Sequence, residues 1–258
     1  MSDLDILRKI PDTGYREPAP THDVKEFYNL VHARRSVRVF LDTPNEDSVI
    51  EKCLELALLA PNSSNLQPWE FYWIKDRNKL EKLRNYCLGQ SAARTAPTLI
   101  VAVAKTNTWD RNRKKMLELF DQQDPKPPKG AYTYYKKVAP MAYYLGLFNW
   151  FGFLKKVLSF FQRIMGKVVP HAPTSYCDMR VWAHKTCALA CENLMLALRA
   201  HGLDSCPMEG LDPHKIKKLL KLDSRSEITM VIGAGKRAPN GIFSKRVRFD
   251  SQLFIKKI

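Results

Sequence analysis

Apolar residues recur with a helical period in several parts of the chain. In residues 46–60, which open with polar residues after a proline, the apolar side chains fall on one face of a helix. They are Ile50, Cys53, Leu54, Ala57 and Leu58. The same pattern predicts four more helices: residues 23–32, a short charged helix ending near residue 87, residues 179–201 and residues 212–222.

Extended segments are interspersed with these helices. Residues 69–76 (WEFYWIKD) predict a strand, and residues 98–104 (TLIVAVA) form a continuous apolar run, which is typical of a buried strand. A third strand with a glycine-rich end is predicted over residues 227–235. We also expect residues 204–210 to be extended and the tail 244–254 to contain a short strand. Strands scattered among helices predict an α+β layered protein.

The middle of the chain has a different pattern. Residues 105–137 are basic and interrupted by prolines, and residues 141–154 (MAYYLGLFNWFGFL) carry Asn149 as their only polar side chain besides tyrosine hydroxyls. This run is shorter than the ~20 residues that a helix needs to span a bilayer. In residues 155–167 the apolar and the basic or polar side chains fall on opposite helical faces. Such a segment fits a membrane-surface helix or a plain core helix.

Length and composition indicate one folded domain. The chain has 258 residues, of which 45% are hydrophobic, enough for a full core without disulfides or metals. Residues 1–22 are rich in proline and predict an N-terminal arm, and residues 23–258 predict a single domain. The N-terminus shows no secretory signal, so we expect a cytoplasmic protein with reduced thiols.

Charge is the unusual feature of the composition. Forty-two Lys and Arg against twenty-six Asp and Glu give a formal net charge of +16. Such a surplus favours anionic partners, which include phosphate cofactors, nucleic acids and acidic lipid surfaces. Nucleic acid is not expected, because no recognised binding motif is present and the basic residues are spread along the chain.

Three residues on one predicted helix raise the question of a metal site. His184, Cys187 and Cys191 would share one face of the helix 179–201, with Cys177 nearby in sequence. No Cys-x-x-Cys pair occurs, and the surrounding helix is apolar. We therefore expect buried small residues and no metal.

A cluster of arginines comes after the first predicted helix. The run ARRSVRVF, residues 33–40, holds Arg34, Arg35, Ser36 and Arg38. A solvated basic face is the simplest interpretation. An anion-binding site is the alternative. One guanidinium group can donate two parallel hydrogen bonds to phosphate oxygens, and a serine hydroxyl adds another donor.

Four blocks of sequence resemble one family in the same order. They are RRSVRVF, APNSSNLQPWEFYWI, CENLMLALRAHGLDSCPMEGLD and the tail basic run KRVR. Together they resemble the FMN-dependent nitroreductase family. The resemblance implies an α+β fold with a central, mostly antiparallel sheet flanked by helices. It also implies a homodimer with exchanged C-terminal tails and a flavin at the interface, contacted by both chains.

The resemblance assigns cofactor contacts to the first two blocks. Arg34 and Ser36 should meet the FMN phosphate, Arg38 should lie near the pyrimidine edge of the ring, and Arg35 could serve either end. A cation near that edge would stabilise the negative charge of reduced flavin. Asn65 should bind the ring, since its amide both donates and accepts hydrogen bonds.

The last two blocks complete the implied cofactor site. The segment Pro207, Met208, Glu209 and Gly210 should pass over the flavin face, where a backbone N–H would meet N5. The tail should bring a basic pair to the phosphate, and its register leaves two alignments open. The candidates are Arg246 and Arg248, with Lys245 next.

The implied activity is that of an FMN-dependent NAD(P)H oxidoreductase. Hydride would pass from NADH or NADPH through FMN to a small electrophile such as a nitroaromatic or a quinone, in a ping-pong scheme. No separate catalytic side chain is expected, because the cofactor carries the chemistry. Alternatives are FMN sequestration or sensing, and other chemistry on the same fold, such as reductive dehalogenation or flavin fragmentation.

Two features remain open under this resemblance. Family members vary in the interval that corresponds to residues 106–178, so residues 141–167 could form a mobile, largely helical lid. They could also contact an anionic membrane, placing the protein peripherally at the inner membrane surface. The helix 179–201 carries five alanines that would suit close packing across the dimer interface: Ala183, Ala188, Ala190, Ala197 and Ala200.

Overall fold

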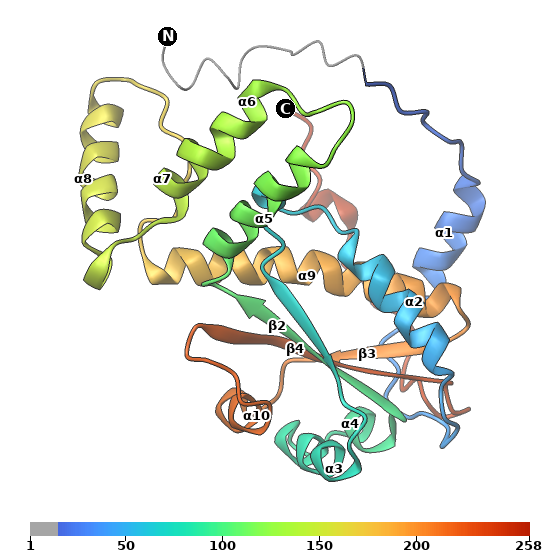
Figure 1. The fold of residues 1–258 in the computed structure, drawn as a ribbon. Helices are drawn as coiled ribbons and strands as arrows, with labels where there is room; N and C mark the ends of the chain where they lie inside the picture. The colour runs from blue at the N-terminus through green and yellow to red at the C-terminus, as the bar shows by residue number, and fades with distance from the viewer. Residues whose placement is uncertain (1–14) are drawn as a thin grey trace.

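A four-stranded antiparallel sheet forms the centre of the protein. The computed structural model describes residues 15–258, so most of the expected N-terminal arm lies outside the described residues. The strand order is β1-β2-β4-β3, and every neighbouring pair is antiparallel (Figure 1). The strands are β1 Trp69–Trp73, β2 Thr98–Lys105, β3 Asp204–Met208 and β4 Ser226–Gly235. The predicted α+β class with an antiparallel sheet is thereby confirmed.

Helices cover both faces of this sheet. One face packs against α2 Asp47–Leu58 and α9 Tyr176–Ala200, and the other packs against α3 Arg77–Tyr86, α4 Ser91–Thr95 and α10 Pro213–Leu219 (Figure 1). Strand β2 is buried at every position. Ile100 and Ala102 face the α9 side, whereas Leu99 and Val101 face the other side. A strand buried on both faces needs the continuous apolar run that the sequence shows.

Helix α9 packs inside its own chain. It begins at a capping box, in which the Ser175 side chain accepts from the Asp178 N–H and the Asp178 carboxylate accepts from the Ser175 N–H. Of the five alanines expected at a dimer interface, Ala183, Ala190 and Ala197 are buried in the core. The expectation was wrong for these three, because their small side chains lie in the protomer's own core with residues of α2 and the sheet.

Most predicted elements are present within a few residues of their expected bounds. Helix α1 spans Val24–Ala33, and its first turn is capped by the Asp23 side chain. The predicted strand in the tail is wrong. The tail is irregular except for one short turn of helix, η5 Ser251–Leu253. Its apolar residues Val247 and Phe249 are exposed. The tail therefore does not pair with a neighbouring strand, and burial of these side chains does not stabilise an extended conformation.

The variable interval is mostly helical. Its elements are α5 Trp109–Asp121, α6 Lys129–Thr133, a wider turn η3 Tyr134–Val138, α7 Ala139–Tyr143, η4 Leu147–Asn149 and α8 Trp150–Ile164. The part from α5 to α7 packs on the main core through Phe120 and Tyr135. Helix α8 stands apart from the sheet and its covering helices (Figure 1). Within residues 15–258, no helix is long and apolar enough to cross a membrane.

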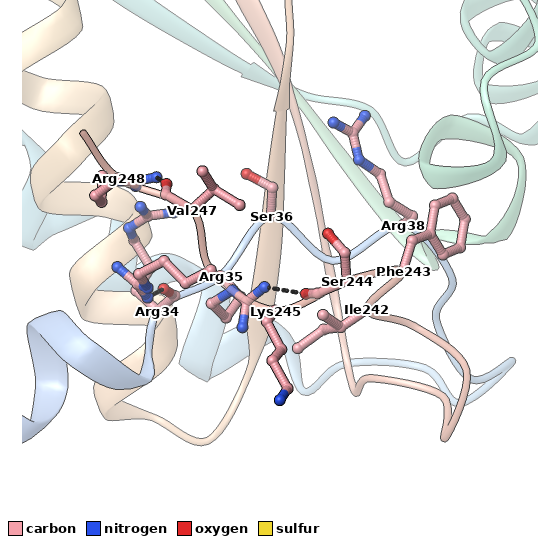
Figure 2. Close-up of a pocket in the computed structure, with 11 residues that line it drawn as sticks. Arg34, Arg35, Ser36, Arg38, Ile242, Phe243, Ser244, Lys245, Val247 and Arg248 are labelled. Carbon is pink, nitrogen blue, oxygen red and sulfur yellow. Dashed lines mark hydrogen bonds between the residues drawn. The ribbon is translucent and has the colours of Figure 1, made fainter.

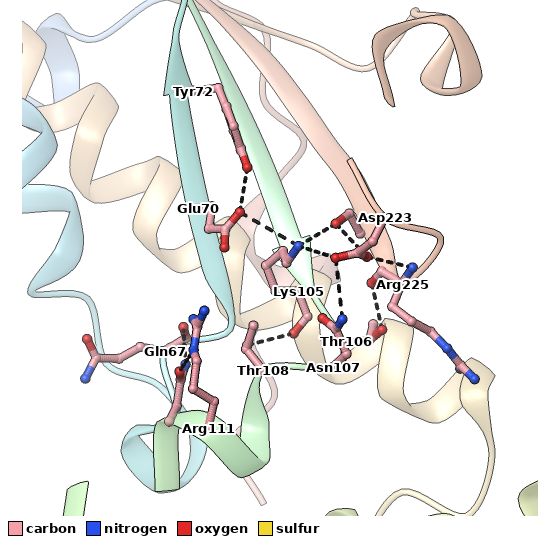
Figure 3. A network of polar contacts seen from close by, with 12 residues as sticks. Gln67, Glu70, Tyr72, Lys105, Thr106, Asn107, Thr108, Arg111, Asp223 and Arg225 are labelled. Carbon is pink, nitrogen blue, oxygen red and sulfur yellow. Dashed lines mark hydrogen bonds and ion pairs between the residues drawn. The ribbon is translucent and has the colours of Figure 1, made fainter. Parts of the chain in front are cut away.

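A buried lysine joins the ends of three strands. The Lys105 ammonium lies 2.8 Å from Asp223 Oδ2, 2.6 Å from Ser226 Oγ and 3.8 Å from Glu70 Oε2 (Figure 3). The Lys105 side chain is only 8% exposed. Although burial opposes it, hydrogen bonds from Lys105 and Ser226 lower the pKa of Asp223 to about 2. This network ties together the strand ends at the point where β2 leads into α5 and the variable interval.

Candidate cofactor site

The arginine segment runs between β3 and the chain after β4. The Val37 N–H donates to the Ser205 carbonyl at 3.0 Å, and the Arg38 N–H donates to the Gly241 carbonyl at 2.7 Å. Val37 itself is fully buried. The alternation of buried Val37 with polar neighbours directs the flanking side chains of Ser36 and Arg38 away from the core. The sequence therefore positions this cluster by anchoring its apolar residues.

These side chains line a pocket of about 380 Å³ together with the tail (Figure 2). Six of the eleven lining residues are cationic, two are serines and three are apolar. They are Arg34, Arg35, Ser36, Arg38, Ile242, Phe243, Ser244, Lys245, Arg246, Val247 and Arg248. No carboxylate is among these eleven residues. Seven of the twelve residues expected to contact a cofactor are thus brought together, from segments about 200 positions apart.

Some of the cations hold the pocket together. Arg246 Nη2 donates to the His32 carbonyl at 2.9 Å and to the Arg34 carbonyl at 2.5 Å, so it satisfies free carbonyls at the end of α1. Arg35 Nη2 donates to the Ser244 carbonyl at 2.6 Å. Burial and the charges of the neighbouring arginines lower the pKa of Arg246. These bonds fasten the tail to the arginine segment.

The other arginines lie toward the two ends of the pocket (Figure 2). In Figure 2 the side chains of Arg34 and Arg248 lie at one end of the pocket, whereas Arg38 points away at the other end. Arg34 Nε lies 3.7 Å from Glu192 Oε1 of α9. This ion pair orients the Arg34 side chain and leaves the other N–H donors of its guanidinium group for further hydrogen bonds. Arg38 lies close enough to Cys206 for its charge to oppose the burial that raises the pKa of that thiol. Cys206 is therefore a buried, neutral thiol.

Residues 207–210 do not line this pocket. They follow Ser205, which lies next to the pocket residue Ser36. Ser36 pairs with Ser205, the second residue of β3, in a parallel bridge. Four residues further, about 13 Å along an extended strand, the chain reaches Glu209. Pro207 and buried Met208 lie in the strand, and Glu209 and Gly210 come after it at the surface. Gln90 Nε2 donates to the Gly210 carbonyl at 2.7 Å, which holds this turn in place.

Asn65 lies in a separate, tightly held loop. The turn η2 Ser63–Asn65 has positive φ at Ser64 (59°) and Asn65 (45°), a region that few side chains adopt. The Asn65 side chain accepts from Asn62 Nδ2 at 3.2 Å and contacts Met116 of α5. It makes no bond to a residue of the basic pocket among those described. A single chain therefore does not bring Asn65 to the arginines.

Three tyrosines of the variable interval hold this loop. Tyr134 and Tyr143 place their hydroxyls 2.6 Å and 3.0 Å from Ser64 Oγ, and the Tyr135 hydroxyl donates to the Ser64 carbonyl at 2.8 Å. Burial raises the pKa of Tyr135 to about 12, so its proton stays on as a donor. The sequence analysis missed these tyrosines. Tyr134 and Tyr135 stand in the run AYTYYKKVAP and Tyr143 follows it, but the spacing of these tyrosines along the chain does not reveal which loop they contact.

Comparison with known proteins agrees with this geometry. The sequence profile of the nitroreductase family matches residues 31–142 and 171–236, which cover the arginine segment, the Asn65 loop and the whole sheet. The chain belongs to the nitroreductase family. The predicted resemblance to this family is confirmed, and with it the class of an oxidoreductase family; three of the four blocks lie within the match, which ends before the tail run KRVR. Residues 143–170, which contain α8, lie outside the match.

Relatives of this nitroreductase-family chain are distant. Protein DrgA of Synechocystis is 26% identical over 90% of this chain and 93% of its own length. A protein of Thermus thermophilus named NADH dehydrogenase is 26% identical over 84% of this chain and 89% of its own. At such identities these proteins share a family with this chain, but their substrates cannot be assigned to it.

Solved structures share the fold. A nitroreductase-like protein of Streptococcus mutans superimposes with a TM-score of 0.69 at 23% identity, covering 92% of this chain and all of that one. A nitroreductase of Exiguobacterium sibiricum, solved in complex with FMN, gives 0.66 at 20% identity and covers 93% of this chain and all of its own. Both show that the nitroreductase-like architecture is present here.

The pocket chemistry fits the phosphate end of FMN. A phosphate dianion needs several cations and hydroxyl or N–H donors and is repelled by carboxylates. The pocket supplies six cations and two serine hydroxyls and has no carboxylate in its lining. Its volume of about 380 Å³ lies in the range of small-ligand sites. A flavin phosphate thus has a donor set in this chain.

Proposed function

We propose that this nitroreductase-family protein is an FMN-dependent NAD(P)H oxidoreductase that reduces a small electrophile. The observation that carries the proposal is the pocket of six cationic side chains and two serines. It is formed by two segments to which the sequence resemblance assigns cofactor contacts. When bound, FMN accepts a hydride from NADH or NADPH and passes electrons to a second small molecule. Nitroaromatics and quinones are the acceptor classes to test first.

The residues of the chain then have distinct tasks. Arg34, Ser36 and Arg248 bind the phosphate through charge-assisted hydrogen bonds. Arg38, at the other end of the pocket, lies near the pyrimidine edge of the ring, where its charge stabilises a reduced flavin. Strand β3 leads from Ser205 toward Gly210, whose lack of a side chain allows close approach of backbone to a ring.

We further propose that the active form is a homodimer. Helix α1 exposes an apolar stripe, Val24, Phe27, Tyr28 and Val31, at the i, i+3, i+4, i+7 spacing of a packed helix face. It has no buried residue in the protomer. Covering this stripe with a second copy would remove it from water and would let the partner's Asn65 loop complete the ring site.

Exchange of the C-terminal tails would fit the same assembly. The tail beyond the pocket exposes an apolar series of Phe249, Leu253, Phe254 and Ile255. An irregular segment with such a surface gains stability by packing on a partner, since its own chain leaves it uncovered. The alternative function, FMN sequestration, requires the same pocket but involves no electron transfer once the cofactor is bound.

An absorption spectrum of the purified protein tests the proposal. Visible flavin bands that bleach with NADH or NADPH, and return when a quinone or nitroaromatic is added, are the expected result. The rates with the two nucleotides at equal concentration identify the donor. Flavin bands that neither nucleotide bleaches would favour sequestration. A colourless protein that takes up no added FMN would overturn the proposal.

A further inference from the structure

Helix α8 is attached to the protein by its polar side. Gly152 is buried, and its N–H donates to the Leu145 carbonyl at 3.0 Å. The Lys155 ammonium donates to the Ala142 carbonyl at 2.7 Å and to the Pro173 carbonyl at 2.6 Å. Burial lowers the pKa of Lys155 to about 8. A glycine and a lysine thus hold the helix in place, together with the half-buried Phe151, whose ring centroid lies 5.7 Å from that of Tyr144.

Gly152 also fixes how closely the helix approaches. A Cβ at position 152 would lie 2.2 Å from the Thr174 carbonyl oxygen and 2.5 Å from Asn149 Oδ1. No larger residue fits without moving backbone. The orientation of α8 about its own axis is therefore set by this contact and by Lys155.

The apolar side of α8 consequently faces outward. Successive residues turn by about 100° around the helix, which puts Trp150, Phe161 and Ile164 opposite Gly152. Trp150 is 69% exposed, Phe160 61% and Ile164 67%. The exposed apolar residues of α8 and its flanks are Leu147, Phe148, Trp150, Phe153, Leu154, Leu158, Phe160, Phe161, Ile164, Met165 and Val168. A contiguous apolar surface of this kind marks an interaction site.

The stretch of chain that carries this surface is basic and has no acidic residue. Residues 125–177 contain eight Lys and Arg and no Asp or Glu. Lys156, Arg163 and Lys167 are exposed. Lys156 and Arg163 lie on the polar side of the helix, and Lys156, about 40° around the helix from Gly152, is next to Phe160 at about 80°. Apolar aromatic residues bordered by lysine and arginine are the composition of helices that lie in a membrane interface.

We propose that α8 docks the protein on an anionic phospholipid bilayer, with its aromatic residues in the acyl boundary and its basic residues at the headgroups. Fifteen residues of helix span about 22 Å, which suits a helix lying in the plane of the surface. A second copy of this helix is a poorer occupant, because residues 125–177 have eight Lys and Arg and no Asp or Glu, so two copies would bring surfaces of the same charge together. Since α8 lies outside the family match, this inference goes beyond the proposed function.

Vesicle flotation of the whole protein tests the docking. Phosphatidylglycerol vesicles should carry the protein at low ionic strength, and phosphatidylcholine vesicles should not. Binding should weaken as the Debye length falls from about 30 Å at 0.01 M salt to about 3 Å at 1 M. Lys156→Gln and Arg163→Gln should each weaken binding about fivefold at low salt, as expected for one basic residue near an anionic surface.

A charge-matched pair of variants separates insertion from attraction. Phe160→Glu with Phe161→Glu should lower binding at least about tenfold more than Ser159→Glu with Gln162→Glu, because only the first pair removes rings from the acyl boundary. Both pairs add two negative charges to the same helix. Circular dichroism and bound FMN should match the wild type in both, since the cofactor residues lie elsewhere.

Tryptophan fluorescence gives a direct measure of depth. Within residues 15–258, which hold all five tryptophans, Trp150 is the one that is exposed. Lipids brominated in their acyl chains should quench wild-type fluorescence, and Trp150→Phe should lose that quenching while still binding vesicles.

Three outcomes would overturn the proposal. One is that the protein does not bind anionic vesicles at low salt. Another is equal loss of binding in the two charge-matched pairs, which would mean attraction of a basic surface without docking of α8. The third is a wild-type dimer that the Phe160→Glu, Phe161→Glu pair turns into monomers, which would assign this surface to a second copy. Loss of flavin would contradict only the proposed function.

Discussion

The Tyr135 hydroxyl donates a hydrogen bond of 2.8 Å to the backbone carbonyl of Ser64. Seventy-one positions separate the two residues, so this bond joins the variable interval to the loop that carries Asn65. Ser64 has a φ of 59°, a conformation that costs free energy unless its surroundings hold it. The interval between α5 and α7 is thus part of what gives the loop its shape.

Tyr135→Phe should loosen this loop. The ring stays packed, but a backbone carbonyl loses its partner, so the free energy of unfolding should fall by about 1 kcal/mol in a denaturant titration. Amide hydrogen exchange should rise in residues 62–67. Tyr144→Phe is the control, because Tyr144 is half exposed and its change should stay within about 0.5 kcal/mol. Unchanged exchange in Tyr135→Phe would contradict the tethering.

Arg34→Ala and Arg38→Ala should each weaken FMN binding. A lost hydrogen bond to a charged group costs about 1.5–3 kcal/mol, which a fluorescence titration of the apoprotein with FMN would resolve. Arg77→Ala removes an exposed arginine of α3, outside the pocket, and should leave affinity unchanged. Wild-type affinity in both pocket variants would remove these residues from the site.

The two tail arginines should behave differently. Arg246 donates to carbonyls at the end of α1, so Arg246→Ala should lower the free energy of unfolding by about 1–2 kcal/mol. Arg248 donates only to the neighbouring Val247 carbonyl among described residues. Arg248→Ala should therefore keep stability within about 0.5 kcal/mol and lower FMN affinity. Thermal unfolding with and without FMN separates the two effects, and the reverse result would exchange the roles.

Phe27→Glu should dissociate the proposed dimer. A charge in the apolar stripe of α1 would be buried without a partner when a second copy covers it. Sedimentation velocity should show a dimer for the wild type and a shift to monomer for Phe27→Glu. Asn29→Glu places the same charge on the polar side of α1 and should remain dimeric. A wild-type monomer with full flavin occupancy would refute the assembly.

Lys105→Met should reduce stability in a pH-dependent way. The pKa of Asp223 is about 2 in the folded protein, below the ordinary value of 3.8, so folding lowers it. The stabilisation from this pair is therefore full above about pH 4 and is lost as the pH falls toward 2. At neutral pH we expect a loss of about 1–2 kcal/mol, because the partner carboxylates are partly hydrated.

Urea titrations across this pH range provide the measurement. The wild type and Lys105→Met should differ most near neutrality and converge toward pH 2. Lys75→Met removes the exposed pair with Asp47, whose side chains are 55% and 60% exposed, and should cost under about 1 kcal/mol. A constant difference from pH 7 to pH 2 would mean that Asp223 does not carry the effect.

Elements with a local pattern were predictable from the amino-acid sequence. Residues 98–104 had to form a central strand, because a run without polar positions is stable only when both faces are covered. Helix α2 was predictable from its apolar side, and α9 from its apolar length and its closing glycine. The arginine cluster and the tail run KRVR could be recognised as a basic site, because residue type alone sets their charge.

Contacts between distant segments, and the direction in which each side of a helix faces, were not predictable from local pattern. Arg246 reaches the His32 carbonyl across 214 positions, a contact that no local spacing encodes. Three alanines of α9 turned inward because α2 and the sheet cover that side of the helix. Helix α8 has an amphipathic pattern that serves a core helix equally well. Its apolar side points outward because Gly152 and Lys155 make the contacts with the body of the protein, and side chains on opposite sides of one helix cannot both face the core.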